Sequence, residues 1–206
     1  MTPRTPITLI TGPLGSGKTR LAQCLARAIP GGSFVGLERL DDGASAARHR
    51  LTADPHLAAR VGHAMSTLVA DGASPCPALE ALLVALHSTR RGVIVVDMIE
   101  QDLDDATQRA VIRYLRRRDG MPLLLMTRST SILDLAEASE SEVIIYCPAN
   151  HSIPMQVIPR GNSGIDLVNT CLASPAVRAR TAGVIAWRKV DVPKRRSVAM
   201  ACPADV

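Results

Sequence analysis

Eight consecutive residues near the N-terminus have the types and the spacing to bind phosphate. They match the pattern G-x-x-x-x-G-K-[ST] at every fixed position and read Gly12-Pro13-Leu14-Gly15-Ser16-Gly17-Lys18-Thr19. Glycines at these points let backbone N–H groups close around phosphate oxygens. The pattern predicts that Lys18 reaches the β- and γ-phosphates of a nucleotide and that Thr19 offers its hydroxyl to Mg²⁺. We take all eight residues and the following Arg20 as candidate nucleotide contacts, with Thr19 also a candidate metal ligand.

The segments on either side of this loop are the ones that phosphate binding needs. Residues 7–11 are apolar or β-branched and predict a buried strand. Residues 20–29 predict a helix, with one face made of Leu21, Leu25, Ala28 and Ile29. A helix that begins at the loop points the positive end of its dipole at a bound anion. The sequence therefore predicts a strand, a phosphate loop and a helix, in that order.

An acid at the end of a second apolar segment supplies a candidate metal ligand. Residues 92–97 read Gly-Val-Ile-Val-Val-Asp and predict a buried strand that ends at Asp97. Because the carboxyl ends of parallel strands meet at one edge of a sheet, Asp97 can lie beside Thr19 and help to hold Mg²⁺. Asp97 is therefore both a candidate metal ligand and a candidate catalytic residue.

Strand and helix patterns alternate along most of the chain, as is typical of an α/β protein. Further strands are predicted at 33–37, 122–127, 143–146 and, at a sheet edge, 155–158; further helices at 44–70 with a break near Pro55, 78–87, 104–118 and 132–138. We expect a P-loop NTPase fold, with a mostly parallel sheet and helices on both faces in three α/β/α layers. Residues 1–160 are predicted to form the nucleotide-binding domain. Residues 161–206 are predicted to be a C-terminal extension of the same domain, with helices at 166–172 and 176–186 and a basic tail.

The composition narrows the class of protein. With 206 residues, 47% of them hydrophobic and 21% charged, the chain has the composition of a globular domain. No apolar run approaches the roughly 18 residues of a membrane-spanning helix, and we expect no export leader. The five cysteines are scattered and lack C-x-x-C spacing, so neither a zinc site nor a disulfide framework is indicated. We therefore expect a cytoplasmic protein.

Arginine supplies most of the formal net charge of +5. Two basic clusters, residues 116–118 and 194–196, can contact nucleic acid or anionic lipid, or can simply form a solvated helix end and a tail. One Trp, two Tyr and one Phe are too few aromatic residues for a platform that stacks single-stranded bases. Nucleic acid is therefore a less favoured partner.

The region after the acid-ended strand resembles the ABC-type ATPases. In that family such a strand runs on to a Leu-Asp pair, the D-loop, and here Asp97 is followed at the family's spacing by Leu103-Asp104. The family's next strand ends in Thr-His, and the corresponding strand here ends in Thr127 followed by Arg128. The resemblance spans about residues 6–158. It implies binding of ATP with Mg²⁺.

The chain departs from the family pattern at positions that serve hydrolysis. Met98 stands where the family has a catalytic glutamate, and methionine cannot accept a proton. Arg128 replaces the switch histidine; it can hold a γ-phosphate by charge but is not a neutral imidazole. The signature Leu-Ser-Gly-Gly-Gln falls on residues 73–77, where only Ser74 is kept and two prolines remove backbone donors. The Q-loop glutamine corresponds to Glu38.

The resemblance therefore implies an ATP-binding protein with weak or partner-dependent hydrolysis. Its catalytic group would be Lys18, Asp97 and Arg128. Two nearby acids, Glu100 and Asp102, are candidates to replace the missing base. ABC-type ATPases enclose nucleotide between two subunits. The resemblance accordingly implies a homodimer, or a partner ATPase or membrane component that supplies an intact signature.

Two alternatives to an ATPase stay open on the sequence. A nucleotide or small-molecule kinase uses the same loop with an arginine-rich lid, and residues 38–50 contain Arg39, Arg48 and Arg50. A regulatory adaptor that binds ATP without hydrolysing it would also lack the base and the switch histidine. No guanine-reading N-K-x-D motif is present, so ATP rather than GTP is the expected nucleotide.

Overall fold

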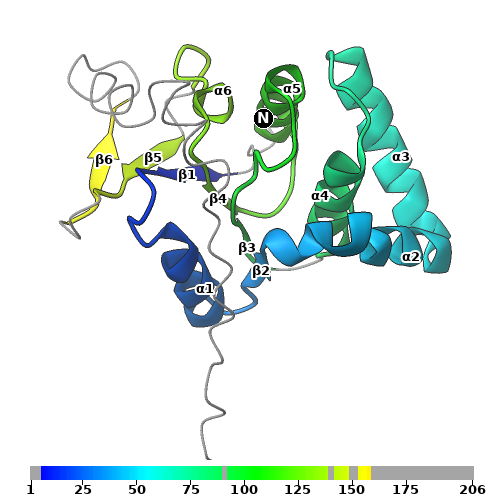
Figure 1. Ribbon diagram of the computed structural model, residues 1–206, viewed down its shortest axis with the longest axis horizontal. Helices are drawn as coiled ribbons and strands as arrows, with labels where there is room; N and C mark the ends of the chain where they lie inside the picture. The colour runs from blue at the N-terminus through cyan, green and yellow to red at the C-terminus, as the bar shows by residue number, and fades with distance from the viewer. Residues whose placement is uncertain (1–5, 90–91, 139–141, 149–152, 159–206) are drawn as a thin grey trace, which may run out of the picture. The chain divides into compact units, whose positions relative to one another are not determined.

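Figure 1 shows the computed structural model of the chain, which describes residues 6–89, 92–138, 142–148 and 153–158. The helices predicted at 166–172 and 176–186, the basic cluster at 194–196 and the domain boundary at 160 lie outside these residues. The described elements are, in order, β1 (Ile7–Thr11), α1 (Lys18–Ala28), β2 (Ser33–Val35), the 3₁₀ segment η1 (Leu37–Gly43), α2 (Ser45–Ala53), α3 (Pro55–Ala70), α4 (Pro77–Ser88), β3 (Ile94–Val96), α5 (Asp105–Arg117), β4 (Leu123–Met126), α6 (Thr130–Leu133), β5 (Val143–Tyr146) and β6 (Met155–Val157).

The six strands form one sheet in the order β2-β3-β4-β1-β5-β6. All neighbouring pairs are parallel except β5 and β6, which are antiparallel at the edge of the sheet. Leu9 of β1 is level with Leu125 of β4 on one side and with Ile144 of β5 on the other. The predicted α/β class with a mostly parallel sheet is confirmed. Because β4 lies between β1 and β3, the carboxyl ends of these three strands follow one another along one edge of the sheet.

Helices cover both faces of the sheet, and the side chains of each strand alternate between the two faces. Leu9 and Leu125 belong to the larger apolar cluster, which the sheet forms with helices α2 to α6. Ile10 and Met126 belong to a smaller cluster, which the sheet forms with α1 on the other face. Figure 1 shows α1, in dark blue, apart from the group of α4, α5 and α6. Burial on both faces explains why these strands are continuous apolar runs in the sequence.

Two alanines let α1 pack closely on the sheet. Ala22 and Ala26 are buried, and the larger Leu21 and Leu25 beside them are half-buried at the margins of the contact. The predicted apolar face is correct for the leucines and wrong for Ala28, which is exposed. The small side chains, and not the large ones, point straight at the strands because a short helix-to-sheet distance has no room for leucine there.

Prolines begin two of the helices that cover the larger cluster. The break predicted near Pro55 is confirmed: α2 ends before it and α3 starts at it. The carboxylate of Asp54 caps α3 by accepting from the backbone N–H groups of His56 and Leu57, each at 3.0 Å. Pro77 likewise begins α4, where its missing N–H group costs nothing. None of the helices in the described part of the chain is long and apolar enough to cross a membrane.

The arginines at the end of α5 are bonded within the fold. Arg116 forms a two-pronged ion pair with Glu142, at 2.8 and 3.1 Å, and a third bond with Asp134 at 3.1 Å. Arg118 donates to the carbonyl of Leu86 at 3.3 Å. The remaining member of the cluster, Arg117, pairs with Asp71. Acids and carbonyls of the fold therefore bind the arginines at 116–118, and of the three only Arg117 is exposed to solvent.

Two segments differ from the predicted elements. The helix predicted at 132–138 is wrong in extent, because α6 ends where Asp134 turns into the left-handed region with φ of 38°. This turn lets the Asp134 carboxylate reach Arg116. The 3₁₀ segment η1, between β2 and α2, was not expected at all. It carries Arg39, whose side chain reaches the carbonyls of Asp97 and Met98.

Candidate functional site

The predicted site residues lie at the carboxyl ends of strands β1, β3 and β4, where the chain leaves the sheet toward opposite faces. The glycine-rich loop follows β1, Arg128 follows β4, and Asp97 follows β3. The chain leaves β1 into α1 on one face and leaves β4 for α6 on the other. In open α/β sheets, ligands bind in the crevice outside the carboxyl ends of strands at such a divergence. The structure thus brings Lys18, Asp97 and Arg128 to one edge of the sheet.

The loop after β1 has a backbone that only glycine adopts readily. Gly12, Gly15 and Gly17 have φ angles of 148°, 81° and 83°. A β-carbon on Gly12 would lie 2.1 Å from the carbonyl oxygen of Cys147, at the end of β5. A β-carbon on Gly15 would meet no atom within 4 Å, so its constraint is the dihedral angle alone. The loop therefore lies tightly against the sheet at its start and is open at its tip.

The Lys18 ammonium is enclosed by the loop that precedes it. It donates to the carbonyls of Gly12 and Pro13, both at 2.8 Å, and to the Ser16 hydroxyl at 3.0 Å. Only 8% of Lys18 is exposed. The loop thus winds around a buried cation whose three acceptors are neutral oxygens.

The first turn of α1 offers further groups that attract anions. Gly17 is the N-cap residue, and no side chain caps the helix. The first N–H groups of a helix have no partner within it, and the helix dipole places partial positive charge there. Thr19 and Arg20 are exposed at this end, and Leu14 is exposed at the tip of the loop. These groups border the loop without being buried by it.

Asp97 lies beside Thr19, as the sequence predicts. Asp97 is only 3% exposed, and its carboxylate is hydrogen-bonded to the Thr19 side chain. Burial raises the pKa of Asp97, against the opposing effects of the Thr19 bond and of the Arg39 and Lys18 charges. A carboxylate and a hydroxyl are the hard oxygen donors that Mg²⁺ takes when phosphates and waters complete its shell. The described residues contain no group of three or more acids, histidines or cysteines that could hold a metal without such help.

Positive charge at the site is not fully compensated. Burial, together with the neighbouring Arg128 charge, lowers the pKa of Lys18 to about 8. Arg128 has a buried Nε without a hydrogen-bond partner. Two cations that repel each other, one of them incompletely bonded, form a place where an anion would be stabilised.

Arg39 also lies at this edge of the sheet, although no local sequence pattern predicts it there. Its guanidinium donates to the carbonyls of Gly36, Asp97 and Met98 at 2.7, 3.0 and 2.7 Å. Burial lowers the pKa of Arg39, and the Asp97 charge opposes this effect. The neighbouring Glu38 instead accepts from the N–H group of Gly36 within its own turn. Contacts between residues so far apart in sequence leave no local pattern, so only the fold reveals them.

The two acids of the loop after β3 lie differently. Glu100 accepts from the Thr127 hydroxyl and from the Arg128 N–H group, both at 2.8 Å, and so faces the end of β4. Asp102 is exposed and accepts from the neighbouring Gln101 side chain at 2.7 Å. Only Glu100 is therefore held among the groups of the site.

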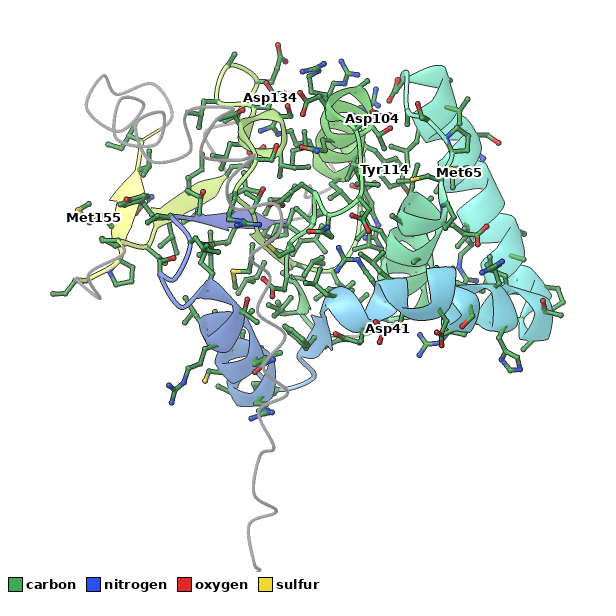
Figure 2. All side chains as sticks on the ribbon, in the orientation of Figure 1. Asp41, Met65, Asp104, Tyr114, Asp134 and Met155 are labelled. Carbon is green, nitrogen blue, oxygen red and sulfur yellow. The ribbon has the colours of Figure 1, made fainter. Side chains whose placement is uncertain are left out.

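The residues that match the D-loop and the signature cap helices and hydrogen-bond to one another in this chain. Asp104, labelled at the start of α5 in Figure 2, caps that helix by accepting from the Thr107 N–H group at 2.7 Å. The Ser74 N–H group donates to the Thr107 hydroxyl at 2.8 Å, and the Ser74 side chain is bonded to Asp104. Cys76 caps α4. Asp104 is thus a helix cap in this chain, and Ser74 is linked to it.

Comparison with known proteins adds no family assignment. No protein-family model matches the chain, and no curated protein sequence matches it either. The coordinates define an α/β protein with a six-stranded, mostly parallel sheet.

Proposed function

We propose that this chain is a P-loop NTPase that binds ATP with Mg²⁺ and hydrolyses it weakly or only with a partner. The observation that carries the proposal is the Lys18 ammonium, wrapped by the glycine-rich loop at an uncapped helix start and adjoining the bonded pair Thr19 and Asp97. A helix N-terminus with a lysine and free N–H groups stabilises phosphate. The location, at a divergence of sheet connections, supports the same ligand class.

The charges of the site favour a ligand that carries both negative and positive charge. Lys18 and Arg128 lack a full counter-charge, and Asp97 is buried with a raised pKa. Phosphate oxygens would compensate the first two groups, and a divalent cation would compensate the carboxylate. A magnesium–nucleotide complex supplies both charges at once, whereas a free anion or a free cation supplies only one.

Mg²⁺ fits the residues present in a specific way. The Asp97 carboxylate and the Thr19 hydroxyl would hold it, directly or through water, and the nucleotide phosphates would complete the shell. The ion would supply charge stabilisation for the phosphates. Arg39, bound to the Asp97 and Met98 carbonyls, keeps the segment that carries the carboxylate in place.

Weak hydrolysis follows from the residues beside Asp97 and after β4. Met98, at the position of the family's glutamate, has left-handed backbone with φ of 49° and brings no group that accepts a proton. Arg128 supplies charge after β4 but no neutral imidazole. The segment with Ser74 is occupied in starting α4 and in bonding to Asp104. These features favour a site that binds ATP well and turns it over slowly.

Calorimetric titration with ATP, ADP and GTP, each with and without Mg²⁺, tests the proposal. We expect Mg²⁺ to tighten ATP binding in the wild type. Asp97→Asn should lose most of this tightening while keeping the affinity measured without metal, because Asp97 acts through the metal. Asp102→Asn is the matched control: it removes the same charge from an exposed site nearby and should behave as the wild type.

Two results would contradict the proposal. One is the absence of nucleotide binding by folded wild-type protein. The other is an equal loss in Asp97→Asn with and without Mg²⁺, which would make Asp97 a structural residue. Turnover measured on the same samples should lie well below the typical enzyme rate of about 10 s⁻¹.

A further inference from the structure

The loop between β3 and α5 delivers one acid to the centre of the site. Met98 and Asp102 both have left-handed backbone, with φ angles of 49° and 58°. Between them Ile99 turns inward and is fully buried. The chain then turns back, and the Glu100 side chain reaches the end of β4. The loop therefore carries an acid at Glu100, beside the end of β4, and not at position 98, directly after Asp97.

The Glu100 carboxylate is held by both of its oxygens. Oε2 accepts from the Thr127 hydroxyl and Oε1 from the Arg128 N–H group, each at 2.8 Å. An ionised carboxylate has about four acceptor positions, so these two bonds leave room for another donor. The bonds therefore orient the group without using up its capacity.

The segment that carries Glu100 is itself anchored to two strands. The Ile99 N–H group donates to the carbonyl of Met126, the last residue of β4, at 3.2 Å. The Arg39 guanidinium holds the carbonyls of Asp97 and Met98 at 3.0 and 2.7 Å. Such anchoring keeps a functional group near one geometry, which a base acting on a bound water needs.

The charges near Glu100 are those of the nucleotide site. Its charge acts on Lys18 and on Arg39, so it lies within electrostatic range of the loop cation and of the group that steadies Asp97. It is bonded to the backbone of Arg128, whose guanidinium is incompletely bonded. Asp102, the next acid along the loop, also acts on Arg39, but its side chain is exposed and is bonded to Gln101.

We propose that Glu100 is the residue that accepts a proton from the water attacking the γ-phosphate, in place of the acid that Met98 does not supply. This inference rests on the proposed function. The water oxygen forms a bond to the γ-phosphorus while the bond from that phosphorus to the β,γ-bridging oxygen breaks. The electron pair of the broken bond stays on ADP. The proton of the water passes to Glu100 and then to the released phosphate or to solvent.

The test compares Glu100→Gln with Asp102→Asn, two variants that each remove one negative charge from the same loop. In Glu100→Gln we expect ATP turnover to fall by at least about 100-fold, as on removal of a positioned base. We also expect the affinity for ATP relative to ADP to rise on the order of tenfold, since a negative charge leaves the surroundings of the γ-phosphate. Asp102→Asn should change both quantities by less than about threefold.

Glu100→Asp separates charge from position. It keeps the charge and withdraws the carboxylate by one methylene, so turnover should fall while the ratio of ATP to ADP affinity stays at the wild-type value. The proposal is overturned if Glu100→Gln turns over as the wild type does. It is also overturned if Glu100→Gln loses affinity for ATP and ADP equally and is less stable, because Glu100 would then have only a structural role.

The outcome stays separate from the proposed function. A wild type that does not bind Mg²⁺ and ATP refutes the proposed function itself. A wild type that binds but shows no measurable turnover leaves the affinity ratio to decide: an unchanged ratio in Glu100→Gln overturns the role of Glu100 while nucleotide binding stands.

Discussion

Replacing Lys18 with methionine should change how stability depends on pH in the nucleotide-free protein. The pKa of Lys18 is lowered from 10.5 to about 8 by burial and by the Arg128 charge. Because the unfolded chain binds more protons than the folded one between these values, wild-type stability rises with pH across that window. The destabilisation is fully present below pH 8 and amounts to about 3 kcal/mol.

Urea denaturation at pH 7 and pH 9 measures how much the unfolding free energy depends on the ionisation of Lys18. Over this interval the wild type should gain about 1 kcal/mol of unfolding free energy relative to Lys18→Met, in which this titration is absent. The bonds from the ammonium to Gly12, Pro13 and Ser16 are lost in the variant at both pH values, and the part of their energy that depends on ionisation is already contained in the Lys18 pKa. The buried Cys147 thiol is replaced by serine in both proteins, because the Lys18 charge acts on its pKa and would otherwise make its titration differ between them. Titrating groups on which Lys18 does not act are common to both proteins and cancel.

Bound nucleotide should raise the pKa of Lys18 again. Phosphates favour the charged ammonium, so binding at pH 8 should take up about half a proton per nucleotide in the wild type and none through this group in Lys18→Met. Calorimetry in buffers of different ionisation enthalpy measures this uptake. Parallel pH dependence of stability in the two proteins, with no difference in proton uptake, would refute the enclosure of Lys18 by the loop.

Three further predictions concern the scaffold and its assembly. Glu142→Gln should lower the unfolding free energy by about 2 kcal/mol because it removes the bidentate carboxylate from Arg116, which keeps only Asp134 as an acidic partner, whereas Arg117→Gln, from a side chain 57% exposed, should cost less than about 1 kcal/mol in the same denaturation experiment. Gly12→Ala should abolish nucleotide binding or unfold the protein, because its β-carbon would lie 2.1 Å from a backbone carbonyl; Gly15→Ala, with open space around it, should cost only about 1 kcal/mol of dihedral strain. Sedimentation with ATP and Mg²⁺ should show at most weak self-association, and a tight ATP-induced homodimer would remove the need for a different partner.

Local patterns in the sequence predict the parts of the site that depend on local physics. Glycine spacing indicates the left-handed turns of the loop, and apolar runs indicate strands whose carboxyl ends meet. The sequence therefore predicts that Lys18, Thr19 and Asp97 lie close together. The break before α3 is equally local, since Pro55 cannot continue a helix and Asp54 caps the next one.

Features that depend on distant partners could not be predicted in this way. Arg39 belongs to the site because η1 places it against the carbonyls after β3, and no spacing encodes that contact. Arg116 belongs to a run of arginines that is typical of a solvated helix end, yet Glu142 and Asp134 from later segments pair with it and largely bury it. Glu100 is recognisable as an acid in the loop, but its bonds to β4 depend on the two left-handed turns that flank it.

The most direct test of nucleotide binding is calorimetric titration of the wild type and of Lys18→Ala with ATP and Mg²⁺. We expect the wild type to bind and the variant to bind about ten- to a hundredfold more weakly, the effect of losing a charge-assisted bond to phosphate. Both proteins should show a cooperative unfolding transition, so that the loss is one of binding and not of folding. Equal affinities in two folded proteins, or no binding by the wild type, would contradict the account.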